Sequence, residues 1–362
     1  MKIAVLLSGG VDSSVALNLL LQEGHQCTAF YLKIWLEDEL STLGECPWED
    51  DLQYARAVCE QAHIPLKILS LQKEYWDMIV TYAIRELKAG RTPNSDMFCN
   101  RLVKFGVFYD KIDTSYQRIA SGHYARLEYQ NGMYVLKRSP DPIKDQTYFL
   151  AYMHQKQLAR ACFPLGSFTK AEVRQQAESF HLPNKNRKDS QGICFLGQIR
   201  YTDFVKFHLG EKPGDFIDLK TGKIVGTHQG YWFYTIGQRQ GLGLSGGPWY
   251  VVKKDVEKNR IYLSRDITER NQLNQKFSVA EFNWISGSKP NKSELQVKIR
   301  HGEFLNHCQL EFIPENAALV TLEKPDQGLA PGQFAVFYDG EICLGGGIIQ
   351  GTTDPEFSTR KD

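Results

Sequence analysis

Short apolar runs alternate with amphipathic helical patterns through the first third of the chain. The apolar runs have the length of buried strands and lie at residues 3–7, 27–34, 66–71 and 118–122. Segments with helical spacing of apolar residues follow the first three runs, at 12–23, 48–63 and 74–89. Alternating strands and helices predict an α/β fold, a doubly wound parallel sheet with helices on both faces.

The pattern changes after residue 199, where short aromatic and β-branched runs alternate with glycine-rich turns. These runs lie at 230–236, 249–253, 261–263, 296–299, 309–312, 334–338 and 342–344. They predict one or two small β-barrels. Upstream, Asn131-Gly132 between two apolar runs predicts a hairpin, and Thr169 with Glu172 forms a capping box that begins a helix reaching about residue 180.

These patterns divide the chain into three folded regions and a tail. We expect a doubly wound α/β domain over residues 1–200 and a central β-rich domain over 201–270. A C-terminal β-barrel is expected over 271–350, followed by a disordered tail at 351–362. A chain of 362 residues is long enough for this number of domains.

The composition is that of an ordinary soluble protein, with 42% hydrophobic and 23% charged residues. No apolar stretch approaches the ~18 residues of a membrane span, and the N-terminus leads straight into a strand, so we expect a cytoplasmic protein that binds no membrane. The net charge of +1 does not by itself mark a nucleic-acid binder. None of the eight cysteines is spaced as Cys-x-x-Cys, which argues against a zinc ribbon.

The most specific chemical signal is the glycine turn between the first strand and the first helix. It consists of Leu6, Leu7, Ser8, Gly9, Gly10, Val11, Asp12 and Ser13. Adjacent glycines allow close approach of backbone N–H groups to a ligand, and the following helix directs its positive dipole end to the same place. The turn therefore predicts a phosphate site, although it lacks the ending of a Walker A loop. An ordinary glycine-rich turn is the alternative.

Cys99 lies in a segment suited to chemistry. It follows Asp96 by three residues, in a stretch that begins with Pro93 and reads as a turn-rich loop. A nearby carboxylate raises a thiol pKa, so Asp96 suits a proton acceptor or a substrate partner better than a thiolate stabiliser. Local sequence leaves open a second interpretation, an aspartate in its own turn and a buried cysteine.

Cys194 is the second unusual cysteine. Lys185, Arg187 and Lys188 precede it, and neighbouring positive charge lowers a thiol pKa. Gly192 gives the segment conformational freedom. A solvated basic face explains the same residues and is locally the simpler interpretation.

Together these segments give the chain a specific family resemblance. The loop at 8–13 is similar to that of the ATP pyrophosphatase (PP-loop) superfamily. The segments around Cys99 and Cys194 resemble the tRNA-specific 2-thiouridylases, as do residues 122–126, 144–150, 235–243, 331–333 and 343–347. The motifs follow the family order over nearly the whole chain. In one departure, Ser95 stands where the family usually has proline, which loosens the backbone but removes no functional group.

The resemblance implies an adenine nucleotide alpha hydrolase-like catalytic domain that thiolates the wobble uridine, position 34, of tRNA. ATP with Mg²⁺ would be bound by residues 6–13 together with Leu32 and Gly122. Cys194 would carry a persulfide from a sulfur-donor protein, Cys99 would be the matching nucleophile, and the two would form a transient disulfide. Asp96 would be the general acid/base. The order of the two cysteine steps stays open.

The resemblance also implies how tRNA is held. Asn94, Ser95 and Asp96 would contact the target base, and the C-terminal barrel would clamp the tRNA. Further contacts are expected at His123, Lys144, Asp145, Gln146, Arg300, His301 and Gln333. We expect a monomer whose only metal is the Mg²⁺ that accompanies ATP.

Two other functions account for parts of this pattern. A small-molecule synthetase of the same superfamily would use the phosphate loop but would need neither cysteine, and it would exchange pyrophosphate with ATP in the absence of tRNA. An inactive RNA-binding protein would keep the barrels but would not need a complete phosphate loop, and it would bind tRNA without turnover.

Overall fold

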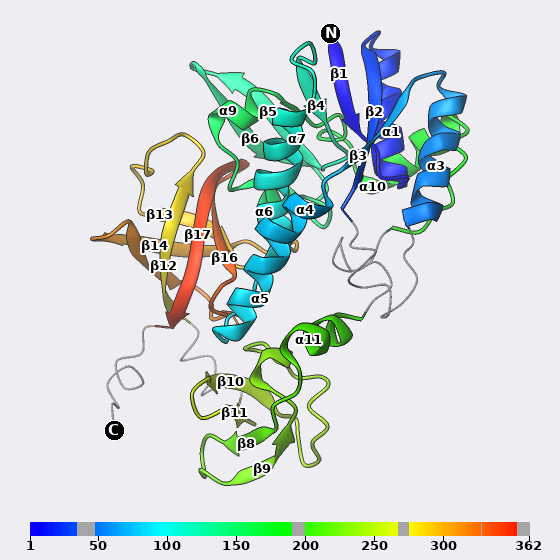
Figure 1. The fold of residues 1–362 in the computed structure, drawn as a ribbon. Coiled ribbons are helices and arrows are strands. Elements are labelled where there is room, and N and C mark those ends of the chain that lie inside the picture. The colour runs from blue at the N-terminus through cyan, green and yellow to red at the C-terminus, as the bar shows by residue number, and fades with distance from the viewer. Residues whose placement is uncertain (35–47, 190–199, 267–274, 327, 353–362) are drawn as a thin grey trace.

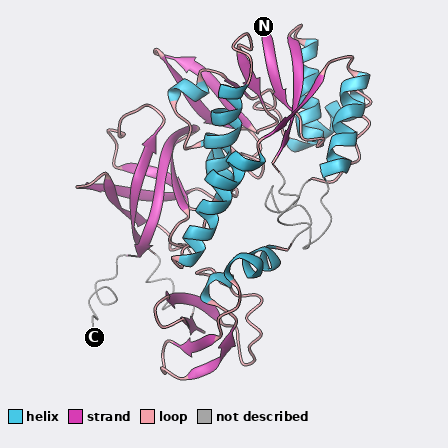
Figure 2. Ribbon diagram, in the orientation of Figure 1, coloured by secondary structure: helices cyan, strands magenta, loops and turns pink. Residues whose placement is uncertain are grey.

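The computed structural model describes residues 1–34, 48–189, 200–266, 275–326 and 328–352. Within these ranges the chain forms a parallel sheet covered by helices, a four-stranded sheet and a barrel (Figures 1 and 2). The predicted fold class is therefore confirmed. In the described residues, no helix combines the length and apolar character needed to cross a bilayer.

The N-terminal sheet has five parallel strands in the order β3-β2-β1-β4-β7. Their bounds are β1 Lys2–Leu6, β2 Gln26–Lys33, β3 Leu66–Ser70, β4 Arg118–Ala120 and β7 Ala161–Cys162. Alternate residues of β1 enter two different cores: Ile3 and Val5 pack on one face, and Ala4 on the other. Because both faces are covered, the strand reads as an unbroken apolar run.

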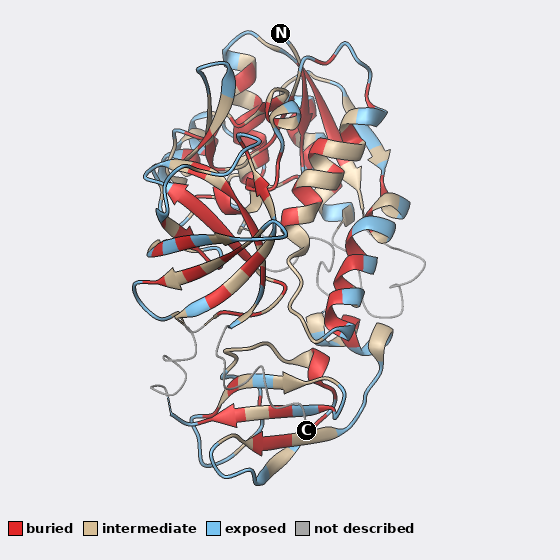
Figure 3. Cartoon of the chain, turned by 90° about the vertical axis from the view of Figure 1, so that its left-hand side faces the viewer, coloured by how far each residue is buried: buried red, intermediate tan, exposed pale blue. Residues whose placement is uncertain are grey.

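Helices cover both faces of this sheet. The core that contains Ile3 also receives α1 (Val11–Gln22) and α3 (Trp48–Gln61). The opposite core receives one continuous helical run made of α4 (Gln72–Tyr75), the π-helical η2 (Trp76–Val80) and α5 (Thr81–Lys88). Figure 3 shows the buried positions concentrated on the strands and on the inward sides of helices.

The segment predicted as a turn-rich loop around Cys99 is helical, so that prediction is wrong. It forms a continuous run of α6 (Ser95–Phe98), the π-helical η3 (Cys99–Val107) and α7 (Phe108–Lys111). The side chain of Asn94 caps the run by accepting a 3.3 Å hydrogen bond from the N–H of Met97. Burial of apolar residues such as Val103 and Phe108 holds the run against the sheet.

The central region packs a helix, α11 (Tyr201–Leu209), beside a four-stranded sheet in the order β10-β11-β8-β9. The strands are β8 Gly214–Asp218, β9 Ile224–His228, β10 Tyr250–Asp255 and β11 Arg260–Ser264. The strand predicted at 230–236 is instead a short 3₁₀ turn, η4 (Tyr231–Phe233). The rings of Tyr231 and Trp232 pack edge to face with centroids 4.9 Å apart, and both are buried without strand pairing, which explains the misleading β-like composition.

The C-terminal region is a closed six-stranded barrel in the order β12-β15-β14-β13-β16-β17, with β17 pairing back to β12. Its strands are β12 Lys276–Trp284, β13 Glu294–Lys298, β14 Asn306–Ile313, β15 Ala317–Leu322, β16 Phe334–Asp339 and β17 Ile342–Thr352. Closure leaves no free sheet edge around the barrel. The predicted tail start at 351 is wrong for its first two residues, because Gly351 and Thr352 belong to β17. Residues 353–362 lie outside the described residues.

The predicted hairpin forms, with strands β5 (Ala125–Gln130) and β6 (Met133–Arg138). Asn131 and Gly132 at its tip have positive φ angles of 50° and 82°. The sequence did not indicate its partner: β6 pairs with β17, joining the N-terminal region to the barrel by a shared sheet. The capping box is also confirmed, since Thr169 and Glu172 exchange hydrogen bonds at the start of α10 (Lys170–Ser179).

Candidate active site

The glycine turn at 8–10 connects the end of β1 to the start of α1. Gly9 has a φ of +76°, and a Cβ atom there would lie 2.1 Å from the carbonyl oxygen of Asp51, so only glycine fits. Ser13 Oγ accepts a 3.2 Å bond from the N–H of Ser8 and donates to the carbonyl of Gly10 at 3.0 Å. Hydroxyl groups of the turn and of the first helical turn therefore help to fix its shape.

Residues distant in sequence lock this turn. Asn184 is buried and donates to the carbonyl of Gly9 at 2.8 Å and to Ser14 Oγ at 2.9 Å. Arg187 donates to the same Gly9 carbonyl at 3.1 Å. Gly122, which follows β4, packs so closely that a Cβ atom would lie 2.8 Å from the N atom of Ser13. Three residues from two distant segments therefore hold the loop.

The other residues predicted to contact the nucleotide, Leu6, Leu7 and Leu32, differ in how far their side chains are exposed. Leu6 and Leu7 are buried, and the N–H of Leu7 donates to the carbonyl of Phe30 at 2.9 Å. Leu32 is half-buried near the end of β2. The two buried leucines therefore support the turn through their packing rather than offering side chains to a ligand.

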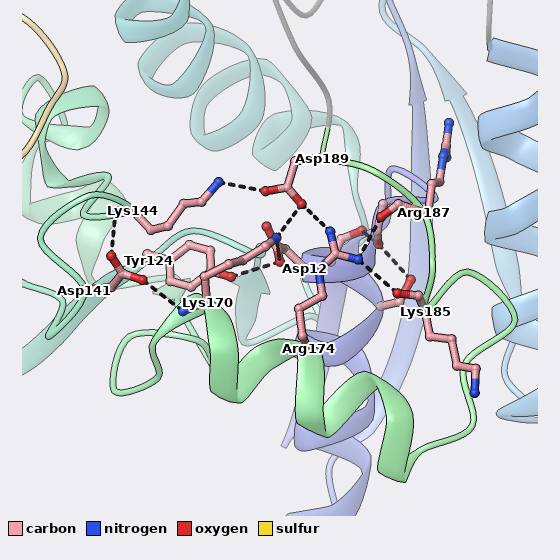
Figure 4. A network of polar contacts seen from close by, with 12 residues as sticks. Asp12, Tyr124, Asp141, Lys144, Lys170, Arg174, Lys185, Arg187 and Asp189 are labelled. Carbon is pink, nitrogen blue, oxygen red and sulfur yellow. Dashed lines mark hydrogen bonds and ion pairs between the residues drawn. The ribbon is translucent and has the colours of Figure 1, made fainter.

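Asp12, in the first turn of α1, begins a chain of charged contacts (Figure 4). Its Oδ1 accepts hydrogen bonds from Tyr124 Oη at 2.9 Å and from Lys170 Nζ at 2.7 Å. The same Lys170 ammonium lies 2.7 Å from Oδ1 of Asp189. Lys170 therefore bridges the helix that follows the glycine turn and the segment that leads to Cys194.

The carboxylate of Asp189 is surrounded by three cationic side chains of this network. It accepts from Lys144 at 2.7 Å and from Arg174 at 2.6 Å, in addition to Lys170. Burial acts to raise the pKa of the Asp189 carboxyl, but the hydrogen bonds from Lys144 and Lys170 outweigh it and hold that pKa well below its usual value. Asp189 is therefore ionised throughout the physiological range.

Sequence reasoning missed Lys170, Arg174 and Asn184 as candidate site residues. The sequence pattern marks Lys170 only as part of the capping-box helix. A lysine in the first turn of a helix opposes the helix dipole, and that conflict is a signal that such a residue serves another contact. No comparable local signal marks Asn184, whose contacts span 175 and 170 residues.

Asp96 and Cys99 lie three residues apart on one helical run, which places them on the same side of it. Cys99 is 2% exposed and Asp96 is half-buried. Cys194 lies outside the described residues, so its distance from Cys99 is not part of this geometry. The structure thus brings together one half of the predicted pair of cysteines with its predicted acid/base group.

The remaining five described cysteines have thiols of raised pKa and are therefore weak nucleophiles. Burial raises the pKa of the thiols of Cys27 and Cys162 to about 11 and of Cys59, Cys308 and Cys343 to about 12. Such thiols hold little thiolate at neutral pH. Cys27 and Cys59 are buried within the apolar core formed on one face of the sheet.

The predicted tRNA-contacting residues of the N-terminal region divide into accessible and enclosed ones. Lys144 is about a third exposed and Gln146 accepts from the N–H of Tyr124 at 3.0 Å. His123 packs against aromatic rings, and burial holds its pKa well below the usual value. Asp145 is wholly buried and pairs with Lys298 at 2.9 Å, so in this conformation its carboxylate offers no surface to tRNA.

The predicted contacts of the barrel also differ from one another. Arg300 is exposed and makes a two-pronged pair with Asp326, at 2.6 and 3.2 Å. His301 stacks on Phe149 with ring centroids 4.9 Å apart. The side chain of Gln333 is only partly exposed, because its Nε2 donates to the two backbone carbonyls just ahead of Asn94.

The donor set bears on Mg²⁺ as well. No group of three or more His, Cys, Asp or Glu residues suited to a metal occurs among the described residues. Mg²⁺ commonly uses one or two carboxylates together with substrate phosphates. Asp12, 31% exposed in the first turn after the phosphate loop, fits that mode of binding.

Three family models match consecutive parts of the chain. Residues 1–198 match the tRNA methyl transferase HUP domain, 202–265 its PRC-barrel domain and 274–349 the aminomethyltransferase β-barrel domain. The tRNA-specific 2-thiouridylase MnmA 1 of Bacteroides thetaiotaomicron is 46% identical over 356 residues, covering 96% of this chain and 99% of that protein. The chain belongs to the tRNA-specific 2-thiouridylase family.

A second relative agrees with this assignment. The tRNA-specific 2-thiouridylase MnmA of Parabacteroides distasonis is 43% identical over 355 residues, covering 96% of this chain and 99% of that protein. The resemblance drawn from the motifs is confirmed, and as a 2-thiouridylase the chain is a sulfurtransferase that modifies tRNA. Membership of this family also supports ATP as the nucleotide used.

A solved structure offers only a distant likeness. A 4-thiouridine synthetase–RNA complex with bound ATP matches 53% of this chain and 44% of that one, with 17% identity and a TM-score of 0.34. That likeness is too low to inform the site.

Proposed function

We propose that this 2-thiouridylase modifies uridine 34 of tRNA in an ATP-dependent reaction that passes sulfur through a persulfide on Cys194. The observation that carries the proposal is the Asp12–Lys170–Asp189 bridge, with Lys144 on the same carboxylate. It joins the loop proposed for ATP, a lysine proposed for tRNA and the segment that leads to Cys194. Three substrates must meet in this reaction, and these contacts bring their proposed segments together.

The first step activates a poor electrophile. The C2 oxygen of uracil attacks the α-phosphorus of ATP, an O–P bond forms, and the bond to pyrophosphate breaks. Residues 8–13 with Gly122 would hold the phosphates, because backbone N–H groups and a helix N-terminus stabilise the developing negative charge. Mg²⁺, held through the phosphates and Asp12, would supply further charge neutralisation. Asp96 would accept the proton that leaves N3 of the base.

The second step delivers sulfur. The terminal sulfur of the Cys194 persulfide attacks C2, and AMP leaves with the former C2 oxygen. The Cys99 thiolate then attacks the Cys194 sulfur, which frees the thiocarbonyl and forms a Cys99–Cys194 disulfide. In the alternative order, Cys99 releases hydrosulfide from the persulfide first. Either order leaves the same disulfide, which a thiol reductant must reopen before the next turnover.

The target base must leave the anticodon stack to reach Asp96, and a single-stranded loop makes that extrusion inexpensive. Asn94 and Ser95 would contact the base. The surrounding tRNA would be held by Lys144, Gln146, His123, Arg300 and His301. Asp145, which is buried and paired with Lys298, would support this surface from the interior. We further propose a cytoplasmic monomer that receives sulfur from a persulfide-carrying donor protein.

Mass spectrometry of nucleosides tests the reaction directly. Full-length protein is incubated with tRNA, Mg-ATP and a persulfide source, and 2-thiouridine, AMP and pyrophosphate are quantified. Cys194→Ala and Cys99→Ala should form no 2-thiouridine beyond background, whereas Cys162→Ala, which removes a thiol of raised pKa, should retain wild-type yield. AMP and pyrophosphate should form in equal amounts with the product.

Three outcomes would reject the whole proposal or part of it. AMP formed on an acceptor other than tRNA, without thiolated uridine, indicates a small-molecule synthetase. Tight tRNA binding without AMP formation indicates an inactive binding protein. A Cys194→Ala variant with normal product yield would retain the overall reaction but exclude the persulfide route.

A further inference from the structure

Residues 92 and 93, just ahead of α6, are hydrogen-bonded to the barrel through the one N–H group and the two carbonyls of their backbone. The N–H of Thr92 donates to the carbonyl of Pro331 at 2.8 Å. In return, Gln333 Nε2 donates to the carbonyls of Thr92 at 3.1 Å and of Pro93 at 3.0 Å. One side chain of the barrel therefore satisfies two successive carbonyls of the catalytic region.

The barrel side of this contact is rigid. The N–H of Gln333 donates to Ala330 at 3.1 Å, and its carbonyl accepts from Ile349, on β17, at 2.8 Å. Gly332 has a φ of +89°, and a Cβ atom there would lie 2.8 Å from the carbonyl of Thr92. This close approach requires glycine and leaves the turn little room to shift against Thr92.

The anchored segment leads directly into the residues proposed for catalysis. Asn94 follows Pro93, and its N–H donates to Tyr82 Oη at 3.4 Å. Asn94 also caps the helical run that carries Asp96 and Cys99. Any displacement of residues 92–93 is therefore passed to the first turn of α6.

We infer that Gln333 is a positioning residue that sets the start of α6, and with it Asp96 and Cys99, before tRNA arrives. The inference rests on the proposed catalytic roles of those two residues. It makes barrel docking a requirement for the chemical step, in addition to any part the barrel plays in holding tRNA.

Ser95 gives the inference a feature particular to this chain. It is the first residue of α6, a position where proline is favoured because its fixed φ suits the helix and the missing N–H has no partner to lose. Asn94 has φ −121° and ψ 84°, outside the helical region, which is compatible with a following proline. With serine at 95 the covalent restraint of a proline ring is missing, so the contacts from Gln333 supply a larger share of the restraint on this turn.

The test compares Gln333→Ala with Gln350→Ala. Gln350 is also a barrel glutamine, but its side chain donates only to the carbonyl of Ile348 on its own strand among the described residues. Three quantities are measured in the full-length protein: the dissociation constant for tRNA, the single-turnover rate of 2-thiouridine formation, and the rate of Cys99 alkylation by iodoacetamide without tRNA. Cys99 is 2% exposed, so alkylation reports fraying of its helix.

Gln333→Ala should slow the single-turnover rate and speed Cys99 alkylation, each by about tenfold from loss of two hydrogen bonds, with tRNA affinity changed less than about threefold. Gln350→Ala should change none of the three. Adding Ser95→Pro to Gln333→Ala should restore a large part of both rates, because proline supplies the lost restraint.

Weakened tRNA binding with unchanged Cys99 alkylation would overturn the inference and leave Gln333 as a tRNA contact only. Equal effects of the two glutamine variants, or a barrel that loses its folded signal in Gln333→Ala, would also overturn it in favour of a structural role. Alkylation is measured without turnover, so failure of the wild-type protein to thiolate tRNA rejects the proposed function separately.

Discussion

The buried pair between Lys298 and Asp145 provides the sharpest test of how the barrel is joined to the rest of the chain. Lys298 lies at the end of β13, whereas Asp145 precedes α8 (Thr147–Leu150) in the N-terminal region. The two side chains have no exposed surface, and their charged atoms lie 2.9 Å apart. We predict that Lys298→Met destabilises the barrel interface substantially.

The magnitude follows from what remains around Asp145. Removing one partner of a buried ion pair costs about 3–5 kcal/mol, because the other charge is left without compensation. Here Arg138 still lies 3.2 Å from Asp145, and Thr147 Oγ1 donates to it at 2.8 Å. We therefore expect the lower end of that range, about 3 kcal/mol.

Native-state hydrogen exchange of the β13 amides is the suitable assay, because it reads the opening free energy of one region in a chain that need not unfold in a single step. The control is Lys292→Met. Lys292 also pairs with an aspartate, Asp339, at 2.6 Å, but the side chains are 64% and 45% exposed. An exposed pair of this kind contributes at most about 1 kcal/mol.

The pH dependence supplies a second signature. Burial lowers the pKa of Lys298, and the opposing attraction of Asp145 does not restore it. Between that lowered pKa and the ordinary lysine value the unfolded state binds more protons, so stability should rise with pH there. Lys298→Met should lose this rise. An opening free energy within about 1 kcal/mol of the Lys292→Met value would refute the reasoning.

Two further predictions concern the nucleotide site and its surroundings. Gly9→Ala should reduce ATP-dependent AMP formation by more than about tenfold, because the new Cβ would collide with the Asp51 carbonyl. Gly24→Ala is the control: it has a φ of +78° and no described atom within 4 Å of the new Cβ, so it should bear only about 1–2 kcal/mol of backbone strain and leave AMP formation intact. Similar AMP formation by the two variants would contradict the contact with Asp51. Burial, and to a smaller extent the charge of Lys104, lowers the pKa of His123 in the folded protein. Below about pH 6.5 the unfolded chain therefore binds a proton that the folded chain does not, and the free energy of unfolding should fall as the pH falls. Denaturant titrations at pH 7.5, 6.5 and 5.5 should show a shallower loss in His123→Gln, by up to about 1.4 kcal/mol per pH unit, and equal slopes would count against it.

Much of the architecture was readable from local patterns. The strand, glycine turn and helix at residues 2–22 follow one another directly, and each is indicated by residues that are close together in sequence. The Asn131-Gly132 hairpin and the Thr169 capping box likewise depend on contacts within a few residues. The same motifs carried the family assignment, because each retains its spacing regardless of where the segment lies in space.

Other features depended on contacts between distant segments. The residues around Cys99 were expected as a loop, because Pro93 just ahead of them reads as part of a turn. They instead begin a helical run at 95–111 whose apolar residues are buried against the sheet. The aromatic run at 231–233 has strand-like composition, but Tyr231 and Trp232 are buried by edge-to-face ring packing outside any strand. Pairing of β6 with β17 joins residues about 200 positions apart, such as Leu136 and Cys343, which no local pattern encodes.

The candidate site divides along the same line. Residue types near a motif indicated phosphate, thiol and carboxylate chemistry, because backbone conformation and charge near those groups are set by adjacent residues. Whether a polar side chain faces tRNA or is enclosed depends on what packs over it. Only the folded chain could place Lys298 over Asp145 and Gln333 on the carbonyls of residues 92 and 93, because burial is a property of segments brought together across more than 150 positions.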